Sequence, residues 1–367
     1  MRRGMQINHS RRCRLLVRAA MAVAAAVAGV GASAAPVHAE AGAKVTVMTR
    51  NVYLGGDLTP SIGAPTLPAF LAANAALLGH VDLVNFPERA KLIAREIREH
   101  KPDLVGLQEV ALWRTGPLAD PAPATEVRYD YLALLLAELN RSGHRYDVAV
   151  VQTEADLEAP VGAPYNVDAR LTMRDVILVR HGGRVKITAT SSGNFTSNLV
   201  FPLPALGTSV TSTRGWTAVD VVHGRRAFRF VNTHLEAFHP GVRVLQAREL
   251  LAGPLADAPG DVLLVGDLNS GPELPVPDNR LAYAELVAGG MVDTWPALHP
   301  GDAGYTAGLG DDLTQPGDAV EHRIDMVMYR GAVVPLSSEL FGVERRTPDG
   351  RWASDHLGHV ATLALSP

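Results

Sequence analysis

Short apolar runs recur along the chain and predict most of its strands. The runs are four to seven residues long, and most are rich in β-branched side chains, as buried strands are. Four of them follow one another between residues 170 and 232 with no helical pattern between them, which does not fit the regular alternation of a TIM barrel. The predicted strands lie at residues 44–48, 104–107, 148–152, 176–179, 185–189, 216–222, 228–232, 262–265, 324–328 and 360–365.

Helical spacing of apolar positions appears between these runs. Residues 87–100 place Ile93 and Ile97 on one face, with Asn85 as a cap and Pro102 ending the segment before the next strand. Many strands with helices distributed between them predict an α/β fold in layers with paired sheets. The other predicted helices are residues 131–141 and 241–251.

Three stretches rich in Pro, Gly or Ala are predicted to be surface loops or excursions: residues 55–85, 116–126 and 157–168. In the first of them, residues 67–78 (LPAFLAANAALL) predict one further helix. That helix either packs on the body of the protein or forms a rim that contacts lipid or another amphiphilic substrate. Because no linker or repeat interrupts residues 40–367, we expect them to form a single catalytic domain.

The first 39 residues have a different composition from the rest of the chain. Six arginines and no acidic residue accompany an apolar run at residues 19–30, and small or modest residues follow at 37–39. This order predicts a secretory signal peptide over residues 1–39 and an exported protein. Residues 10–13 (SRRC) also loosely resemble a twin-arginine signal. A membrane anchor is the alternative, although the apolar run is short for a membrane span.

Removal of this segment would change two properties of the chain. Cys13 is the only cysteine, so no disulfide or thiol chemistry is expected in the mature protein. The net charge would move from −4 to about −10, because six arginines and no acids would be lost. An acidic chain is not typical of a passive nucleic-acid binder, although local basic patches remain compatible with it.

Polar side chains gather where the predicted strands end. Glu109 follows one run, His234 ends the Asn-Thr-His segment after another, and Asp267 and Asn269 follow a third. As alternate residues leaving a strand, Asp267 and Asn269 are expected to point to the same side, and Gly266 is expected to allow close backbone approach. A cap or a turn would explain each motif alone, but clustered carboxylates need partners, which favours one shared site. Its further members are Asn51, Asp325, Asp355 and His356.

Such a set of side chains supports a specific chemistry. Carboxylate and amide oxygens are hard ligands that suit Mg²⁺, Mn²⁺ or Ca²⁺, and the lack of cysteines disfavours a structural zinc site. A hard cation beside an aspartate and a histidine suits the attack of water on phosphorus. The sequence contains neither G-x-S-x-G nor a Walker-type loop, so it gives no support for a serine hydrolase or a P-loop enzyme.

Six motifs in this order resemble the endonuclease/exonuclease/phosphatase superfamily, the deoxyribonuclease-I-like metal phosphoesterases. The resemblance implies a four-layered α/β sandwich, in which two sheets pack face to face and helices cover them. It also implies an active site at one end of the sheets and single-step in-line hydrolysis with no covalent intermediate. The motifs are TRNV (49–52), GLQEV (106–110), VNTHLEA (231–237), VGDLNS (265–270), HRIDMVM (322–328) and SDHLGHV (354–360).

The resemblance also implies a role for each motif residue. Glu109 would be the main metal ligand, helped by Asn51, with Asp355 near the same cation or holding its water. The cation would be Mg²⁺, with Mn²⁺ or Ca²⁺ as alternatives. Asp267 would orient and deprotonate the attacking water, and Asn269 would fix Asp267 or the phosphate.

Two histidines would complete the site. His234 would bind or stabilise the phosphoryl oxygens. His356 would stabilise the transition state or assist the leaving oxygen, and Asp325 would hold its ring. The chain departs from the family pattern at residues 173–175, where Asp175 would support a catalytic histidine and Arg174 would face phosphate. Alternatively, Arg174 and Asp175 are an exposed adjacent pair that takes no part in the site.

These features support three functional hypotheses. The first is an exported phosphoesterase acting on a lipid head group or another small phosphate ester, with peripheral membrane contact and no obligate protein partner. The second is a secreted nuclease of the same chemistry. The third is an inactive binding module, which the complete set of catalytic motifs argues against.

Overall fold

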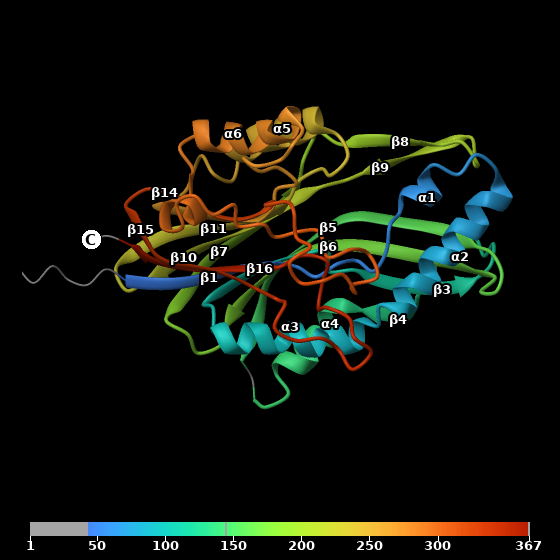
Figure 1. The fold of residues 1–367 in the computed structure, drawn as a ribbon, viewed down its shortest axis with the longest axis horizontal. Coiled ribbons are helices and arrows are strands. Elements are labelled where there is room, and N and C mark those ends of the chain that lie inside the picture. Colours follow the sequence, from blue (N-terminus) through green and yellow to red (C-terminus); the bar gives the residue numbers. More distant parts are fainter. Residues whose placement is uncertain (1–42, 144, 366–367) are drawn as a thin grey trace, which may run out of the picture. The chain divides into compact units, whose positions relative to one another are not determined.

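Two β-sheets pack face to face, and helices cover the outer face of each (Figure 1). The structure, a computed structural model, describes residues 43–143 and 145–365. The predicted signal peptide and its twin-arginine motif lie outside these residues. Residues Glu40–Pro367 cluster as one compact unit.

Sheet A is a mixed sheet that contains both chain-terminal strands. Its central strands β1 and β2 are parallel, and β16 runs antiparallel to β1. The strand β5 (Tyr146–Val161) pairs with β6 beside the main path. The path itself runs through β15 (Val333–Phe341), β16 (Gly358–Leu365), β1 (Ala43–Asn51), β2 (Leu104–Gln108), β6 (Val167–Arg180), β3 (Leu112–Pro117) and β4 (Glu126–Asp130).

Sheet B lies opposite and contributes the remaining motif strands. A separate hairpin of β8 (Leu199–Leu203) and β9 (Thr208–Ser212) extends beside it. In order across the sheet, the strands are β13 (Val292–Asp293), β14 (Asp325–Arg330), β12 (Asp261–Asp267), β11 (Arg226–His234), β10 (Gly215–His223) and β7 (Val185–Asn194).

Alternating side chains of the apolar runs fill two different cores. Val47 and Val265 belong to the core between the sheets, whereas Met48 and Leu264 belong to the cores on the outer, helix-covered faces. A strand that is covered on both faces is apolar at successive positions, which explains why these runs show no polar alternation.

The helices form the two outer layers. On sheet A, α3 and α4 pack against each other over the core that contains Met48, and α2 packs against β5. On sheet B, α5 and α6 pair over the core that contains Leu264. The predicted four-layered α/β sandwich is therefore confirmed. The helices are α1 (Thr59–Ile62), α2 (Leu67–Leu83), α3 (Phe86–His100), α4 (Tyr131–Leu139), α5 (Pro240–Ala252), α6 (Leu281–Ala288), α7 (Thr294–Leu298) and the 3₁₀ turn η1 (Pro277–Arg280).

One loop prediction was wrong. Residues 157–168 were expected to be a surface excursion, but residues 157–161 continue β5 and residue 167 begins β6. The acidic residues Asp156 and Glu158 alternate with half-buried Leu157, so this extension of the sheet lacks the apolar run used to identify strands. The sequence analysis also did not predict β3, β4, β8, β9, β13 and β15.

The predicted rim helix at residues 67–78 is present as part of α2. Among the described residues, no single helix has both the length and the apolar character needed to cross a membrane. The consecutive helices α2 and α3 pass that test only as a pair, and a bend of 49° separates them.

Candidate active site

Strand register brings the sequence motifs to one end of the sandwich. In sheet B, His234 pairs with Asp267 across parallel strands, and Asp267 pairs with Asp325 across antiparallel strands. In sheet A, Asn51 ends β1 beside Gln108, which ends β2. Because these strands are direct neighbours, residues far apart in sequence lie in one row.

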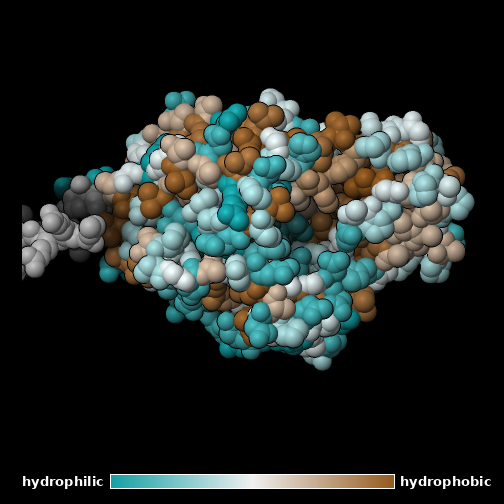
Figure 2. All heavy atoms as spheres, turned by 45° about the horizontal axis from the view of Figure 1, so that its top comes forward, coloured by the Kyte–Doolittle hydropathy of each residue, from teal (hydrophilic) through white to brown (hydrophobic). Residues whose placement is uncertain are grey.

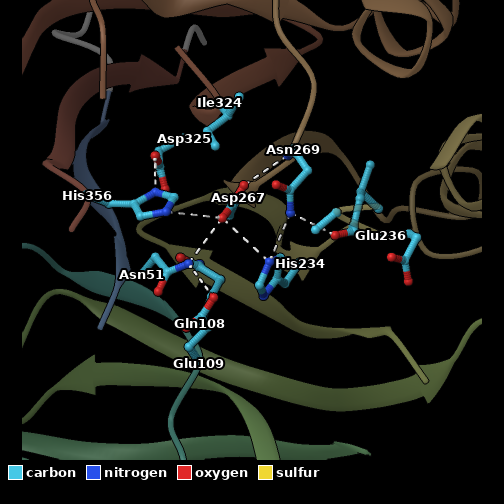
Figure 3. Close-up of polar contacts among 12 residues, drawn as sticks. Asn51, Gln108, Glu109, His234, Glu236, Asp267, Asn269, Ile324, Asp325 and His356 are labelled. Atoms are coloured by element: carbon cyan, nitrogen blue, oxygen red, sulfur yellow. Dashed lines mark hydrogen bonds and ion pairs between the residues drawn. The ribbon is translucent and has the colours of Figure 1, made fainter. Parts of the chain in front are cut away.

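Asp267 lies at the centre of the site (Figure 3). Its Oδ2 accepts a hydrogen bond from Asn51 Nδ2 at 3.1 Å. The same oxygen lies 3.5 Å from His234 Nε2 and 3.9 Å from His356 Nε2. Burial raises the pKa of Asp267 to about 7, and the neighbouring Asp325 carboxylate adds to the shift. A buried carboxylate with a pKa near neutrality is suited to accept a proton.

The turn after β12 directs Asp267 and Asn269 toward the same point, although not by the alternation expected of a strand. β12 ends at Asp267, and Asn269 has a left-handed backbone with a φ of 47°. Its backbone N–H donates to Asp267 Oδ1 at 2.9 Å, which forms an Asx turn. Gly266 has a φ of 149°, and a Cβ there would lie 2.0 Å from the carbonyl oxygen of Thr233. The expected close backbone approach at Gly266 is therefore confirmed.

A chain of hydrogen bonds holds His356. Its Nδ1 lies 2.8 Å from Asp325 Oδ2, and the Thr306 hydroxyl donates to the same oxygen at 2.6 Å. Burial alone would lower the pKa of His356, but Asp325 and Asp355 outweigh it and raise that pKa well above the usual value. This environment favours the cationic form of His356 next to Asp267.

His234 has the opposite environment. Arg214 Nη1 lies 2.9 Å from its Nδ1, and the amide nitrogen of Asn269 lies 3.1 Å from its Nε2. Burial lowers the pKa of His234 well below the usual value, and the charges of Arg214 and His356 lower it further. Because a guanidinium can only donate, Nδ1 is the acceptor nitrogen, and a neutral ring carries its proton on Nε2, which faces Asp267.

Two buried carboxyl groups lie behind Arg214. Glu154 Oε2 is 3.8 Å from Arg214 Nη1, and Glu154 Oε1 accepts from the backbone N–H of Gly215 at 2.9 Å. Burial raises the pKa of Glu154 to about 7 and also raises the pKa of Asp175, whose carboxyl group contacts Glu154. One nitrogen or carboxylate oxygen from each of Glu154, Asp175 and His234 lies within 4.8 Å of the corresponding atoms of the other two. Asp175 therefore lies near His234, and its support of a catalytic histidine stays a prediction.

Arg214 and Glu154 were not identified from the sequence. Arg214 precedes the predicted strand at 216–222 and Glu154 follows the one at 148–152, but neither belongs to a recognisable motif. The position of Glu154 just after an apolar run is the same signal that identified Glu109. A survey of every acid at a strand end would have included it.

The predicted metal ligands Glu109 and Asp355 lie at the edge of this centre. Glu109 Oε1 accepts from Asn51 Nδ2 at 3.1 Å, and its Oε2 accepts from the Leu54 backbone N–H at 2.7 Å. The amide oxygen of Asn51 accepts from the Tyr53 N–H, so in this structure Asn51 orients Glu109 through its nitrogen. Burial raises the pKa of Asp355 to about 6, and the Glu109 charge contributes to that rise.

The expectation that Arg174 faces phosphate was wrong. Its guanidinium donates to the carbonyl oxygens of Val110 and Ala111 and, at 2.6 Å, to Asp130, which caps α4. Consecutive residues of a strand point to opposite faces, so Arg174 and Asp175 cannot both face the site. Arg174 instead fixes the loop that follows β2.

Buried arginines connect the loops that carry the motif residues. Arg89 of α3 donates to the carbonyl oxygens of Val52 and Tyr53, which follow Asn51, and to that of Ala353, which precedes the Ser-Asp-His segment. Arg50 donates to the His356 carbonyl oxygen and pairs with Glu96 at 3.1 Å. These contacts hold residues 50–53 and residues 353–356, which are far apart in sequence, next to each other at the site.

Comparisons with known proteins agree with this geometry. The sequence model described as "Endonuclease/Exonuclease/phosphatase family" matches residues 71–356. A search of curated proteins found no match.

Solved structures of low sequence identity share the fold. An endonuclease/exonuclease/phosphatase from Bacteroides vulgatus is 17% identical with a TM-score of 0.52, and the match covers 88% of this chain and 99% of that one. The mannosyl-6-phosphatase Bt3783 of Bacteroides thetaiotaomicron is 16% identical with a TM-score of 0.51, covering 87% and 99%. D. rerio TDP2 complexed with single-strand DNA product is 18% identical with a TM-score of 0.50, covering 87% and 98%.

The family match spans most of the chain, and the motifs that carry it meet in one buried centre. The protein belongs to the endonuclease/exonuclease/phosphatase family and is thus a metal-dependent phosphoric ester hydrolase.

Proposed function

We propose that the protein is an exported, Mg²⁺-dependent phosphoesterase that hydrolyses a lipid head-group ester or another small phosphate ester. The observation that carries this proposal is the placement of Asp267 between His234 and His356, with Asn51 bonded to the same carboxylate. A base between a neutral and a cationic histidine is suited to deliver water to a phosphoryl group.

Glu109 and Asp355 fit a hard divalent cation. Both carboxylates are partly buried; burial raises the pKa of Asp355 to about 6, the charge of His356 opposes that rise and the charge of Glu109 adds to it. Carboxylate oxygens suit Mg²⁺, with Mn²⁺ and Ca²⁺ as alternatives. When bound, such a cation polarises the phosphoryl oxygens and offsets their negative charge.

The remaining steps belong to side chains of this protein. Asp267 accepts a proton from the attacking water, while Asn269 fixes the Asp267 carboxylate through its backbone N–H. Neutral His234 hydrogen-bonds a phosphoryl oxygen. Cationic His356 stabilises the charge that develops on the leaving oxygen, and Asp325 orients its ring. Attack and departure occur in one in-line step.

Substrate class is tested by a parallel assay of the purified protein with Mg²⁺. The substrates are sphingomyelin, phosphoinositides, bis-p-nitrophenyl phosphate and plasmid DNA, and we expect cleavage of at least one of the non-nucleic substrates. Cleavage of DNA alone would establish the nuclease alternative. That alternative is included because a protein of similar fold, D. rerio TDP2, has been solved with single-strand DNA product. No turnover with any metal would contradict the proposal.

Export has its own test. N-terminal sequencing of the protein recovered outside the producing cell is expected to begin at Glu40, because the predicted signal covers residues 1–39. Recovery of an intact N-terminus in the cell envelope would favour the membrane-anchor alternative.

A further inference from the structure

An apolar groove of about 250 Å³ lies between the first two helices, the extended β5–β6 hairpin and the β8–β9 hairpin. Phe70 and Leu78 of α2 form one wall, Leu157 and Ala159 of β5 form the floor, and Leu206 at the hairpin turn forms the opposite wall. Figure 2 shows a hollow on one face of the molecule with hydrophobic residues along its rim. The elements that build this groove are mostly those that the motifs did not predict.

The groove adjoins the active site. A second, smaller cavity of about 70 Å³ is lined by the predicted metal ligand Glu109 and by Glu154 and Arg214. The two cavities share five lining residues, which places the groove next to the cavity at Glu109. The shared residues are Leu58, Ile62, Leu157, Leu171 and Val210.

Most polar groups of the groove are already engaged within the protein; the exception is the buried Ser61 hydroxyl, which has no hydrogen-bond partner among the described residues. Asp156 pairs with Arg170 at 2.9 Å, Glu158 accepts from the Ala124 N–H at 3.1 Å, and the Asn74 amide donates to a backbone carbonyl. No lysine or arginine lines the groove among the described residues. A polynucleotide would need cationic side chains and a peptide would need free hydrogen-bonding groups, whereas an alkyl chain needs only apolar contact.

An exposed apolar side chain continues this surface at the hairpin turn, where Leu206 is 42% exposed. The ring of Phe201 on β8 contacts that of Phe238, in the loop that follows His234, with centroids 5.3 Å apart. This contact joins the hairpin wall of the groove to the segment that carries a site histidine.

We infer that the groove binds an alkyl chain of the substrate, so that the enzyme acts on amphiphilic phosphate esters. This inference rests on the proposed function, because the phosphate of the same molecule must lie at Glu109 and Asp267. It narrows the substrate class to esters that carry a hydrocarbon chain close to the phosphorus.

Calorimetric titration with linear alkyl phosphonates tests the inference without turnover, because their carbon–phosphorus bond is not hydrolysed by this chemistry. The purified protein with Mg²⁺ is titrated with ethyl, butyl, hexyl and octyl phosphonate, below the concentration at which micelles form. We expect the Kd to fall by up to about fourfold for each buried methylene group. The heat capacity change of binding should become more negative along the series.

Two variants locate the chain. Leu206→Asp and Val210→Asp place a charge in the groove and should reduce the ratio of the ethyl to the octyl Kd at least about tenfold. Leu336→Asp is the matched control, because Leu336 on β15 is also 42% exposed but lies outside the groove lining. Thermal unfolding of each variant identifies any that fails to fold, and Leu206→Asp changes an exposed turn residue that tolerates substitution.

The outcomes separate this inference from the proposed function. A Kd that is independent of chain length, or a graded series that neither groove variant changes, overturns the inference. Hydrolysis of methyl p-nitrophenyl phosphate is measured in parallel. Turnover of that ester with a flat phosphonate series rejects the groove alone. Graded binding with no hydrolysis of any ester in the substrate panel rejects the proposed function, and with it the inferred substrate class, and leaves only the binding of an alkyl chain in the groove.

Discussion

The two histidines of the active site differ in the charge that lies behind each ring. His356 Nδ1 faces the carboxylate of Asp325 at 2.8 Å, whereas His234 Nδ1 faces the guanidinium of Arg214 at 2.9 Å. Both Nε2 atoms approach the same oxygen of Asp267. Both rings are buried, and burial favours the neutral form of each, so the neighbouring charge decides their difference.

This comparison shows how one buried centre can hold two histidines with different tasks. The carboxylates around His356 raise its pKa and make it a source of positive charge. Burial and the charge of Arg214 both favour the neutral form of His234, which can hydrogen-bond phosphate without adding a second cation. Environments that separate the pKa values of neighbouring groups are how active sites assign acid and base roles.

Substitution of Asp267, the residue that both histidines approach, should have the largest effect. In Asp267→Asn the amide keeps the shape of the side chain but cannot accept a proton from water. We expect kcat to fall by about 10³- to 10⁴-fold with little change in stability, measured at saturating Mg²⁺ on the best substrate of the panel. Asp257→Asn, the same change at an exposed position, is the control. Full activity of Asp267→Asn would show that another carboxylate is the base.

The arginine behind His234 is tested next. Arg214→Met leaves a buried carboxyl pair without its cation, so we expect a loss of about 3–5 kcal/mol in the free energy of unfolding at pH 8. The pKa of His234 should rise, because the positive charge that lowers it is gone. Urea unfolding measures the first effect and NMR titration measures the second. Arg248→Met removes an exposed arginine paired with Glu285 and is the control, for which we expect little change.

The pH dependence of stability examines the carboxyl pair itself. The pKa of Glu154 is about 7 in the folded protein and near 4.5 when unfolded, so folding favours the protonated form. Its contribution is complete below pH 4.5 and is lost as the pH rises through 7, a loss on the order of 3 kcal/mol. Glu154→Gln should therefore reduce the fall in the free energy of unfolding between pH 5 and pH 8.

The control for this experiment is Glu321→Gln, because the Glu321 side chain is 71% exposed. Urea unfolding of the three proteins at matched ionic strength gives the slopes to be compared. An identical slope for wild type and Glu154→Gln would mean that Glu154 is ionised in the folded protein at neutral pH.

The sequence alone was sufficient to identify the candidate site residues that belong to a motif and adjoin an apolar strand. Asp267, His234 and Asp325 each adjoin such a strand, and strand pairing alone aligns them. Arg214 and Glu154 could not be paired in this way, because neither lies in a motif and they meet across the fold: Arg214 Nη1 lies 3.8 Å from Glu154 Oε2, and Glu154 also accepts from the N–H of Gly215, 61 residues away in sequence. Their functional importance arises from packing between segments, not from a local pattern.

The same distinction applies to the fold. Strands between two covered faces are apolar at every position, and all ten predicted runs contain a strand. The β8–β9 hairpin is half-exposed, and Pro202 interrupts the apolar run of β8, which argues against a strand. Of the segments that form the apolar groove, α2 was predicted from the sequence, whereas the hairpin and the outer part of β5 were not.

The smallest effect is expected from Asp325→Asn, which weakens the support of His356 while keeping its hydrogen-bonding shape. The pKa of His356 should fall, because the nearest raising charge is removed, and kcat should fall by about 10²-fold. NMR titration of the His356 ring separates this effect from a general loss of structure. Glu154→Gln is the matching change on the His234 side of the site and should leave the His356 pKa unchanged. If Asp325→Asn left that pKa unchanged instead, the contrast between the two histidines would not depend on their immediate partners.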